Sequence, residues 1–124
     1  MILLKATERN WGLIGPGDWD KHSWKINDDG WYQYKETYRT GDPDAFPAIP
    51  EMVTEGTLSY DQMNRLKAAL AQEWSDEKTD ASDGVAWEFK LYDENGEIVK
   101  HRELGYIYGI EPFETIVSVL TEDI

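Results

Sequence analysis

Apolar and polar residues alternate over several short stretches of this chain, with the period of two that is typical of β-strands. The alternation is cleanest over residues 85–92, where every second residue is apolar: Val85, Trp87, Phe89 and Leu91. Less regular alternation predicts further strands over residues 2–9, 22–27, 31–39 and 97–108, and residues 51–55 are a candidate for a short edge strand. We therefore expect a β-sheet that buries one of its faces.

Turn signals join four of these strands into two hairpins. The sequence Asp-Asp-Gly at 28–30 lies between the second and third predicted strands, and Asp-Glu-Asn-Gly at 93–96 lies between the last two. Glycines and prolines predict loops over residues 10–21 and 40–50. Gly105 predicts a bulge within the last strand.

Two amphipathic stripes predict two helices. Ser59 and Gln62 have the spacing of a capping box, and we expect the helix that they open to run to about Trp74. Its apolar residues recur at intervals of three and four: Met63, Leu66, Leu70 and Trp74. A second stripe follows Pro112, a residue that suits the first helical position, and ends near Thr121. It consists of Phe113, Ile116, Val117 and Leu120.

The order of these elements is a strand, a β-hairpin, a helix, a second β-hairpin and a second helix. Locally joined strands pair antiparallel, and two amphipathic helices on one face would bury the apolar residues of both layers. We therefore expect one α+β domain over residues 1–124, with an antiparallel sheet of about four to five strands and both helices on the same face. Nothing alternates as βαβ, which argues against a parallel nucleotide-binding sheet.

The absence of cysteine excludes a disulfide framework, a thiolate zinc site and a cysteine nucleophile. No apolar run has the length of a signal peptide or of a membrane span. From these features we expect a cytoplasmic protein that does not bind membranes. The sequence does not indicate an oligomeric state.

The net charge of −13 is unevenly distributed along the chain. Residues 1–40 contain six acids and six bases, whereas the remainder contains 19 acids and six bases. A field of this sign repels phosphate backbones and anionic lipids. We therefore expect no direct nucleic-acid binding, and a partner with a basic surface if the acidity is functional. The alternative is that the acidity serves only solubility.

Familiar catalytic motifs are missing from the sequence. His22 and Ser23 are adjacent, but neighbours in a strand point to opposite faces. His22 and His101 lack zinc-site spacing, and the glycines of 15–17 lack the lysine of a P-loop. Three carboxylate pairs could lie at the distance that a glycosidase needs: Asp18 with Asp20, Asp28 with Asp29, or Glu88 with an acid on the next strand. Accidental pairs of this kind are expected among 25 acids. We expect no catalytic, cofactor-binding or metal-binding residues, and hence no enzyme, although a weak divalent-ion site in the acidic stretch 76–83 stays open.

The tryptophans are a stronger signal than any catalytic motif. Trp24, Trp74 and Trp87 lie in predicted strand and helix stripes, and we expect them in the core. Trp11 and Trp19 lie in a glycine-rich loop with few apolar neighbours in the sequence. We expect each of them either to contact a partner or ligand or simply to pack within the loop.

Two functions are consistent with this pattern. The first is a binding domain that acts by protein–protein interaction, as an inhibitor, immunity or anti-defence protein would, with an acidic surface offered to a basic partner site. The second is a small-molecule or carbohydrate binder, or a weak carboxylate-based hydrolase, that uses the tryptophans as a stacking platform; a domain without activity of its own is a third possibility. The candidate partner-binding residues are Trp11, Trp19, Trp31, Asp76, Glu77, Asp80 and Asp83.

Overall fold

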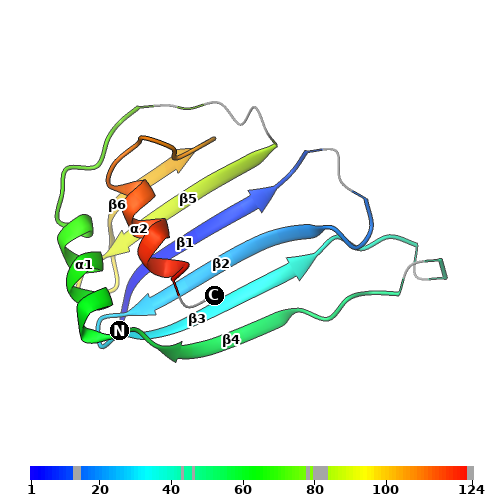
Figure 1. The fold of residues 1–124 in the computed structure, drawn as a ribbon, viewed down its shortest axis with the longest axis horizontal. Coiled ribbons are helices and arrows are strands. Elements are labelled where there is room, and N and C mark those ends of the chain that lie inside the picture. Colours follow the sequence, from blue (N-terminus) through cyan, green and yellow to red (C-terminus); the bar gives the residue numbers. More distant parts are fainter. Residues whose placement is uncertain (13–14, 43, 46, 78, 80–83, 123–124) are drawn as a thin grey trace.

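The computed structural model describes residues 1–12, 15–42, 44–45, 47–77, 79 and 84–122. Within these residues the chain forms six strands and two helices in the order ββββαββα (Figure 1). The strands are β1 (Ile2–Asn10), β2 (Trp19–Asn27), β3 (Trp31–Tyr38), β4 (Met52–Thr57), β5 (Val85–Tyr92) and β6 (Ile98–Leu104). The helices are α1 (Tyr60–Leu70) and α2 (Phe113–Leu120).

All six strands form one antiparallel sheet in the order β4-β3-β2-β1-β5-β6. The N-terminal strand β1 is therefore central, with β2 and β5 as its neighbours. The sheet has more strands than the sequence predicted because the candidate segment near residue 52 does pair with β3, as an edge strand. The predicted α+β class and both hairpins are confirmed.

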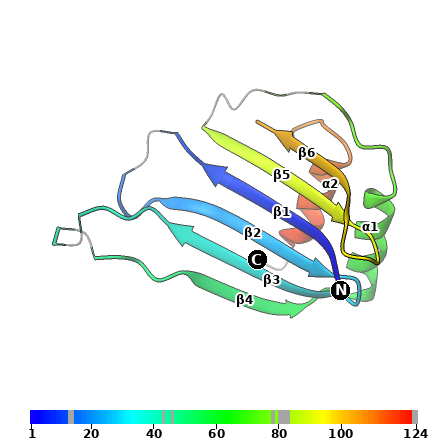
Figure 2. The ribbon, with the colours of Figure 1, turned by 180° about the vertical axis from the view of Figure 1, so that it is seen from behind.

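Both helices cover the same face of the sheet, and the other face is open (Figures 1 and 2). Alternation along each strand sends apolar residues toward the helices, so that Leu4, Ile26 and Phe89 are completely buried. Burial of such side chains contributes about 1.5–3 kcal/mol each. The helices lie over the end of the sheet at which β1 begins, and the other end of β1–β4 extends beyond them (Figure 1).

Aromatic rings make up the centre of the core. Six rings form a continuous series with neighbouring centroids 4.9–5.8 Å apart: Tyr34, Trp24, Trp87, Phe89, Phe113 and Trp74. Rings from β2 and β5 can meet because β1 between them contributes the small side chain of Ala6, which pairs with Trp24 on one side and Phe89 on the other. The expected core positions of Trp24, Trp74 and Trp87 are confirmed.

Helix α1 begins at the predicted capping box. The Ser59 hydroxyl accepts a hydrogen bond from the backbone N–H of Gln62, and the Gln62 side chain accepts one from the backbone N–H of Ser59. The helix ends at Leu70, earlier than predicted, and Trp74 lies beyond it but still packs into the core. The position of Trp74 in the apolar stripe therefore reflects its packing into the core and not a continuation of the helix.

The end of the predicted last strand differs from the expectation. Strand β6 ends at Leu104, and Gly105 is not a bulge within it: its N–H donates to the Thr79 carbonyl in the preceding loop. The next residues form turns that bury Ile107 and Ile110. Pro112 is the N-cap of α2 rather than its first helical residue.

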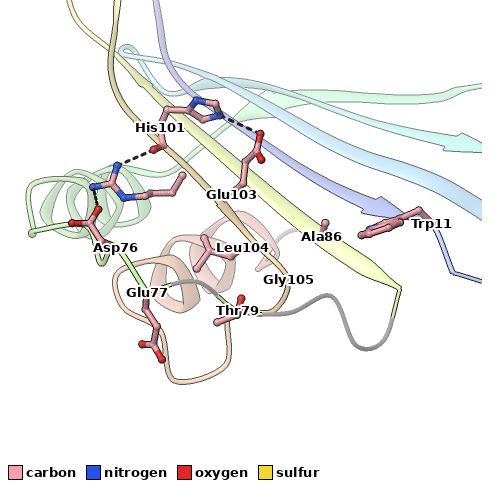
Figure 3. A pocket seen from close by; sticks show the side chains of 10 residues that line it. Trp11, Asp76, Glu77, Thr79, Ala86, His101, Glu103, Leu104 and Gly105 are labelled. Atoms are coloured by element: carbon pink, nitrogen blue, oxygen red, sulfur yellow. Dashed lines mark hydrogen bonds and ion pairs between the residues drawn. The ribbon is translucent and has the colours of Figure 1, made fainter.

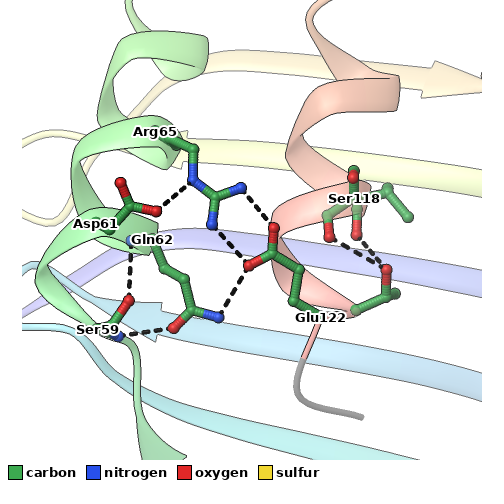
Figure 4. A network of polar contacts seen from close by, with 8 residues as sticks. Ser59, Asp61, Gln62, Arg65, Ser118 and Glu122 are labelled. Carbon is green, nitrogen blue, oxygen red and sulfur yellow. Dashed lines mark hydrogen bonds and ion pairs between the residues drawn. The ribbon is translucent and has the colours of Figure 1, made fainter.

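Polar side chains join the two helices at their exposed surface (Figure 4). Arg65 of α1 donates to both carboxylate oxygens of Glu122, which follows α2, and also to Asp61. The Gln62 amide donates to the same Glu122 carboxylate. This network holds the C-terminal segment against α1. No helix among the described residues is long and apolar enough to cross a membrane.

Candidate functional site

Three of the predicted partner-binding residues line one hollow of about 850 Å³ at the β6 side of the sheet (Figure 3). We call it the edge hollow. It is formed by Trp11, by Asp76, Glu77 and Thr79 of the α1–β5 loop, by Ala86 of β5, and by residues 101–105 in and after β6. Asp80 and Asp83 were predicted to belong to the same surface, but they lie outside the described residues.

The loop that carries Asp76 and Glu77 is attached alongside β6. Arg102 of β6 donates from Nε to the Ser75 carbonyl, 3.1 Å away, and forms an ion pair of 2.8 Å with Asp76. Thr79 bonds to the backbone of Tyr106 through its hydroxyl, which donates to the carbonyl and accepts from the N–H. The loop thereby covers part of an edge strand, which would otherwise present unpaired backbone groups.

Trp11 lies at the other end of the edge hollow. Its backbone N–H donates to the Gly84 carbonyl at 2.7 Å, which ties the residue after β1 to the residue before β5. Gly84 has φ of +73°, and a Cβ there would lie 2.5 Å from the Gly12 Cα, so the position requires glycine. The indole itself is 62% exposed. The backbone therefore holds Trp11 in place while its ring faces solvent.

A histidine and two glutamates gather on the open sheet face beside the edge hollow. His101 Nε2 lies 3.0 Å from a Glu88 oxygen and 3.9 Å from a Glu103 oxygen. Burial alone would raise the pKa of Glu88, but the hydrogen bond from His101 and the charge of Lys90 lower it below its ordinary value. The three ligand atoms lie within 4.8 Å of one another, so this is the set of described residues that could hold a divalent ion.

The other two predicted tryptophans lie elsewhere. Trp19 is not in a loop but begins β2, because it pairs with Tyr38 across a bulge, and its ring stacks on His22 with centroids 4.2 Å apart. Trp31 lies on the open face near the first hairpin turn, with the Lys25 ammonium 5.7 Å from its ring centroid. The three indoles therefore do not form one stacking platform.

Sequence reasoning missed a polar group on the helix-covered face. His22 lies between two glutamates on neighbouring strands: Nδ1 is 2.8 Å from Glu8 of β1, and Nε2 is 3.3 Å from Glu36 of β3. The Tyr34 hydroxyl donates to Glu36 at 3.3 Å. The signal in the sequence was the period of two, which puts Glu8, His22 and Glu36 on the same face as the core residues.

This group has its own electrostatics. Burial lowers the pKa of His22, but the hydrogen bonds and charges of Glu8 and Glu36 raise it more, so that it lies above 6.5. Burial and the negative charge of Glu36 raise the pKa of Tyr34. Glu8 also lines a second hollow, of about 350 Å³, between Trp87 and α2.

The acidic pairs that a weak hydrolase would need are already engaged or exposed. The Asp28 carboxylate contacts the N-terminal ammonium, and that of Asp29 accepts a hydrogen bond from the Trp31 N–H. Asp20 forms an ion pair with Arg39. These carboxylates are all at least partly open to solvent.

Comparison of the chain with protein-family models, with curated proteins and with solved structures finds no match. Its function therefore has to be inferred from its own residues.

Proposed function

We propose that this protein is a binding domain that acts by contact with another protein, and that the edge hollow is the surface that binds the partner. The observation that carries this proposal is the convergence of Trp11 with Asp76 and Glu77 around one hollow, although they are far apart in the sequence. An exposed indole contributes large contact area at low entropic cost.

The charges of the edge hollow indicate what kind of partner fits. Asp76, Glu77 and Glu103 all line the edge hollow and are exposed, and Arg102 forms an ion pair with Asp76. A partner with lysines or arginines around an apolar socket for Trp11 would meet complementary charge. This is how an inhibitor, immunity or anti-defence protein would block a basic functional site.

The competing small-molecule function has less support. A carbohydrate site would need stacked aromatic rings beside carboxylates, and Trp11, Trp19 and Trp31 lie in three separate places. A hydrolase would need a desolvated acid, and the aspartates considered from the sequence are exposed. The geometry therefore favours the protein-binding role.

The test is capture of the partner from a lysate of the cells that make the protein, compared between variants. The immobilised wild type is expected to retain a stoichiometric protein at low and moderate salt. Trp11→Ala should lose it, because hot-spot tryptophans at interfaces contribute about 2–4 kcal/mol to binding. Replacement of both acids, Asp76→Lys with Glu77→Lys, should lose it most completely at low salt, where repulsion between the new lysines and a basic partner is least screened.

A matched control is available on the same hairpin. Glu94→Lys with Glu97→Lys makes the same change of charge in the exposed β5–β6 turn, away from the edge hollow. This variant should retain the partner as the wild type does. Equal retention of the partner by all variants would reject the edge hollow as the binding surface. If the immobilised wild type retains no protein at low salt, the small-molecule alternative is favoured.

A further inference from the structure

The open face of the sheet carries a concentration of positive charge in a chain whose net charge is −13. The regularly alternating positions of β1, β2 and β3 that point to this face include five bases, and Asp20 at the bulge in β2 forms an ion pair with Arg39. The bases are Lys5, Arg9, Lys21, Lys25 and Lys35. The glutamates of the same strands point to the helix-covered face, where Glu8 and Glu36 bind His22.

Four of these lysines surround a hollow of about 260 Å³, which we call the lysine hollow. It is lined by Lys5, Lys21, Lys25 and Lys35 together with the side chains of Thr7 and Ser23. The strand register explains the arrangement: Thr7 pairs with Ser23, and Ser23 pairs with Lys35, so that two hydroxyls and an ammonium share one row across three strands. Lys5 and Lys25 form the row on one side, and Lys21 lies on the other side.

The positive charges of the lysine hollow are not neutralised within the protein. None of its four lysines forms an ion pair with a carboxylate in the part of the chain that the structure describes. Lys5 lies over the ring of Tyr92 and Lys25 over that of Trp31, both at 5.7 Å. Lys21 and Lys35 make no contact of this kind. Four ammonium groups held around one hollow repel each other, and a bound anion would relieve that repulsion.

Acidic residues limit the size of the anion. Glu51 lines the lysine hollow together with the lysines, and Glu55 of β4 bonds to Gln33, another lining residue. On the other side, Glu88 and Glu103 lie on the same face of β5 and β6. A long polyanion would have to pass all of these carboxylates, whereas a compact anion among the four lysines would meet only that of Glu51.

We propose that the lysine hollow binds a small, multiply charged phosphate compound through its phosphate groups. The ammonium groups supply charge, and the hydroxyls of Thr7 and Ser23 donate hydrogen bonds to phosphate oxygens. The site is separate from the edge hollow, so it stands whether or not the protein-binding role does.

The test uses inorganic pyrophosphate as the probe, at constant ionic strength maintained with sodium chloride. Calorimetry should detect binding to the full chain, and amide NMR shifts should map to Thr7, Ser23 and their neighbours. Lys21→Gln and Lys35→Gln should each weaken binding by about tenfold, since a charge-assisted hydrogen bond contributes about 1.5–3 kcal/mol. Neither side chain forms a hydrogen bond or an ion pair with any residue that the structure describes, so these variants should fold normally.

Lys67→Gln, on the exposed surface of α1, removes the same charge away from the lysine hollow and should leave pyrophosphate binding unchanged. Three results would overturn the proposal. The first is that pyrophosphate produces no more heat of binding and no larger amide NMR shifts than sodium chloride at the same ionic strength. The second is an equal loss of binding in the Lys67→Gln control. The third is tighter binding of a single-stranded oligonucleotide than of pyrophosphate through the same lysines, which would make the ligand a nucleic acid.

Discussion

His22 connects neighbouring strands through its hydrogen bonds and also packs against aromatic rings. It links β1 to β3 through Glu8 and Glu36, and its ring lies between Trp19 and Trp24. A neutral imidazole has only one N–H donor, so it cannot donate to both carboxylates, whereas the protonated ring can. Protonation therefore strengthens the contacts that hold the three strands together.

The raised pKa of His22 predicts how stability depends on pH. A group whose pKa is higher in the folded than in the unfolded state stabilises the fold fully below the unfolded value, here 6.5, and this contribution is lost as pH rises through the folded value. NMR titration of the ring protons should show a midpoint above 6.5. Glu8→Gln should lower that midpoint. The free energy of unfolding in urea should fall as the pH rises through this midpoint in the wild type, and should fall less in His22→Gln.

A midpoint below 6.5 would show that burial outweighs the two glutamates.

At the scale of elements, helix α1 illustrates how a local signal becomes a stable unit. The capping box satisfies two backbone donors at its N-terminus, and the stripe that includes Met63 and Leu66 packs onto the sheet. Its exposed face meets Glu122 through Arg65 and Gln62 (Figure 4). The first two features are encoded within twelve residues of sequence, while the contact with Glu122 depends on how α2 is placed.

Ser59→Ala should lower the free energy of unfolding by about 1 kcal/mol, because the backbone N–H of Gln62 loses its acceptor. Chemical denaturation of the two proteins measures this difference. Ser118→Ala is the matched control on the exposed side of α2 and should change stability by less than about 0.5 kcal/mol. Similar losses in both variants would indicate that the Ser59 cap contributes little.

Strand and turn predictions succeeded for physical reasons that apply over short distances. A period of two places one set of side chains in the core, and Gly30 and Gly96 adopt the positive φ that their turns require. The predictions failed where a distant segment decided the outcome. Trp19 joined β2 because Tyr38 paired with it, and the last strand stopped at Leu104 because Gly105 bonded to Thr79.

For the whole molecule, the sorting of charge between surfaces is the dominant feature. Bases gather on the open face of β1–β3, and acids gather in the loops and around the edge hollow. An excess of 13 negative charges over a small domain destabilises the compact state by self-repulsion.

Sodium chloride should therefore raise the melting temperature, because added ions screen this repulsion. Thermal unfolding at increasing chloride concentrations checks the direction. The variant Glu94→Lys with Glu97→Lys, which is less negative, should show a smaller rise. A melting temperature that falls with salt would indicate that ion pairs such as Arg65–Glu122 outweigh the net repulsion.

The candidate site could be predicted only in part. An exposed Trp11 and an acidic loop were visible in the sequence, because composition and turn residues indicate exposure. Their meeting at the edge hollow depends on the pairing of β1 with β5 and on the attachment of the loop to β6. Nothing near Trp11 in the sequence points to residue 76.

The sequence by itself determined the α+β class, the two hairpins, the capped helix and the tryptophans of the core. Each follows from periodicity, turn chemistry or capping, which involve neighbouring residues. The tertiary structure alone decided that the first forty residues, neutral in sum, present a lysine-rich face on one side and a half-buried Glu8–His22–Glu36 group on the other. The reason is that strand register, set by packing of the whole sheet, determines which charges become neighbours.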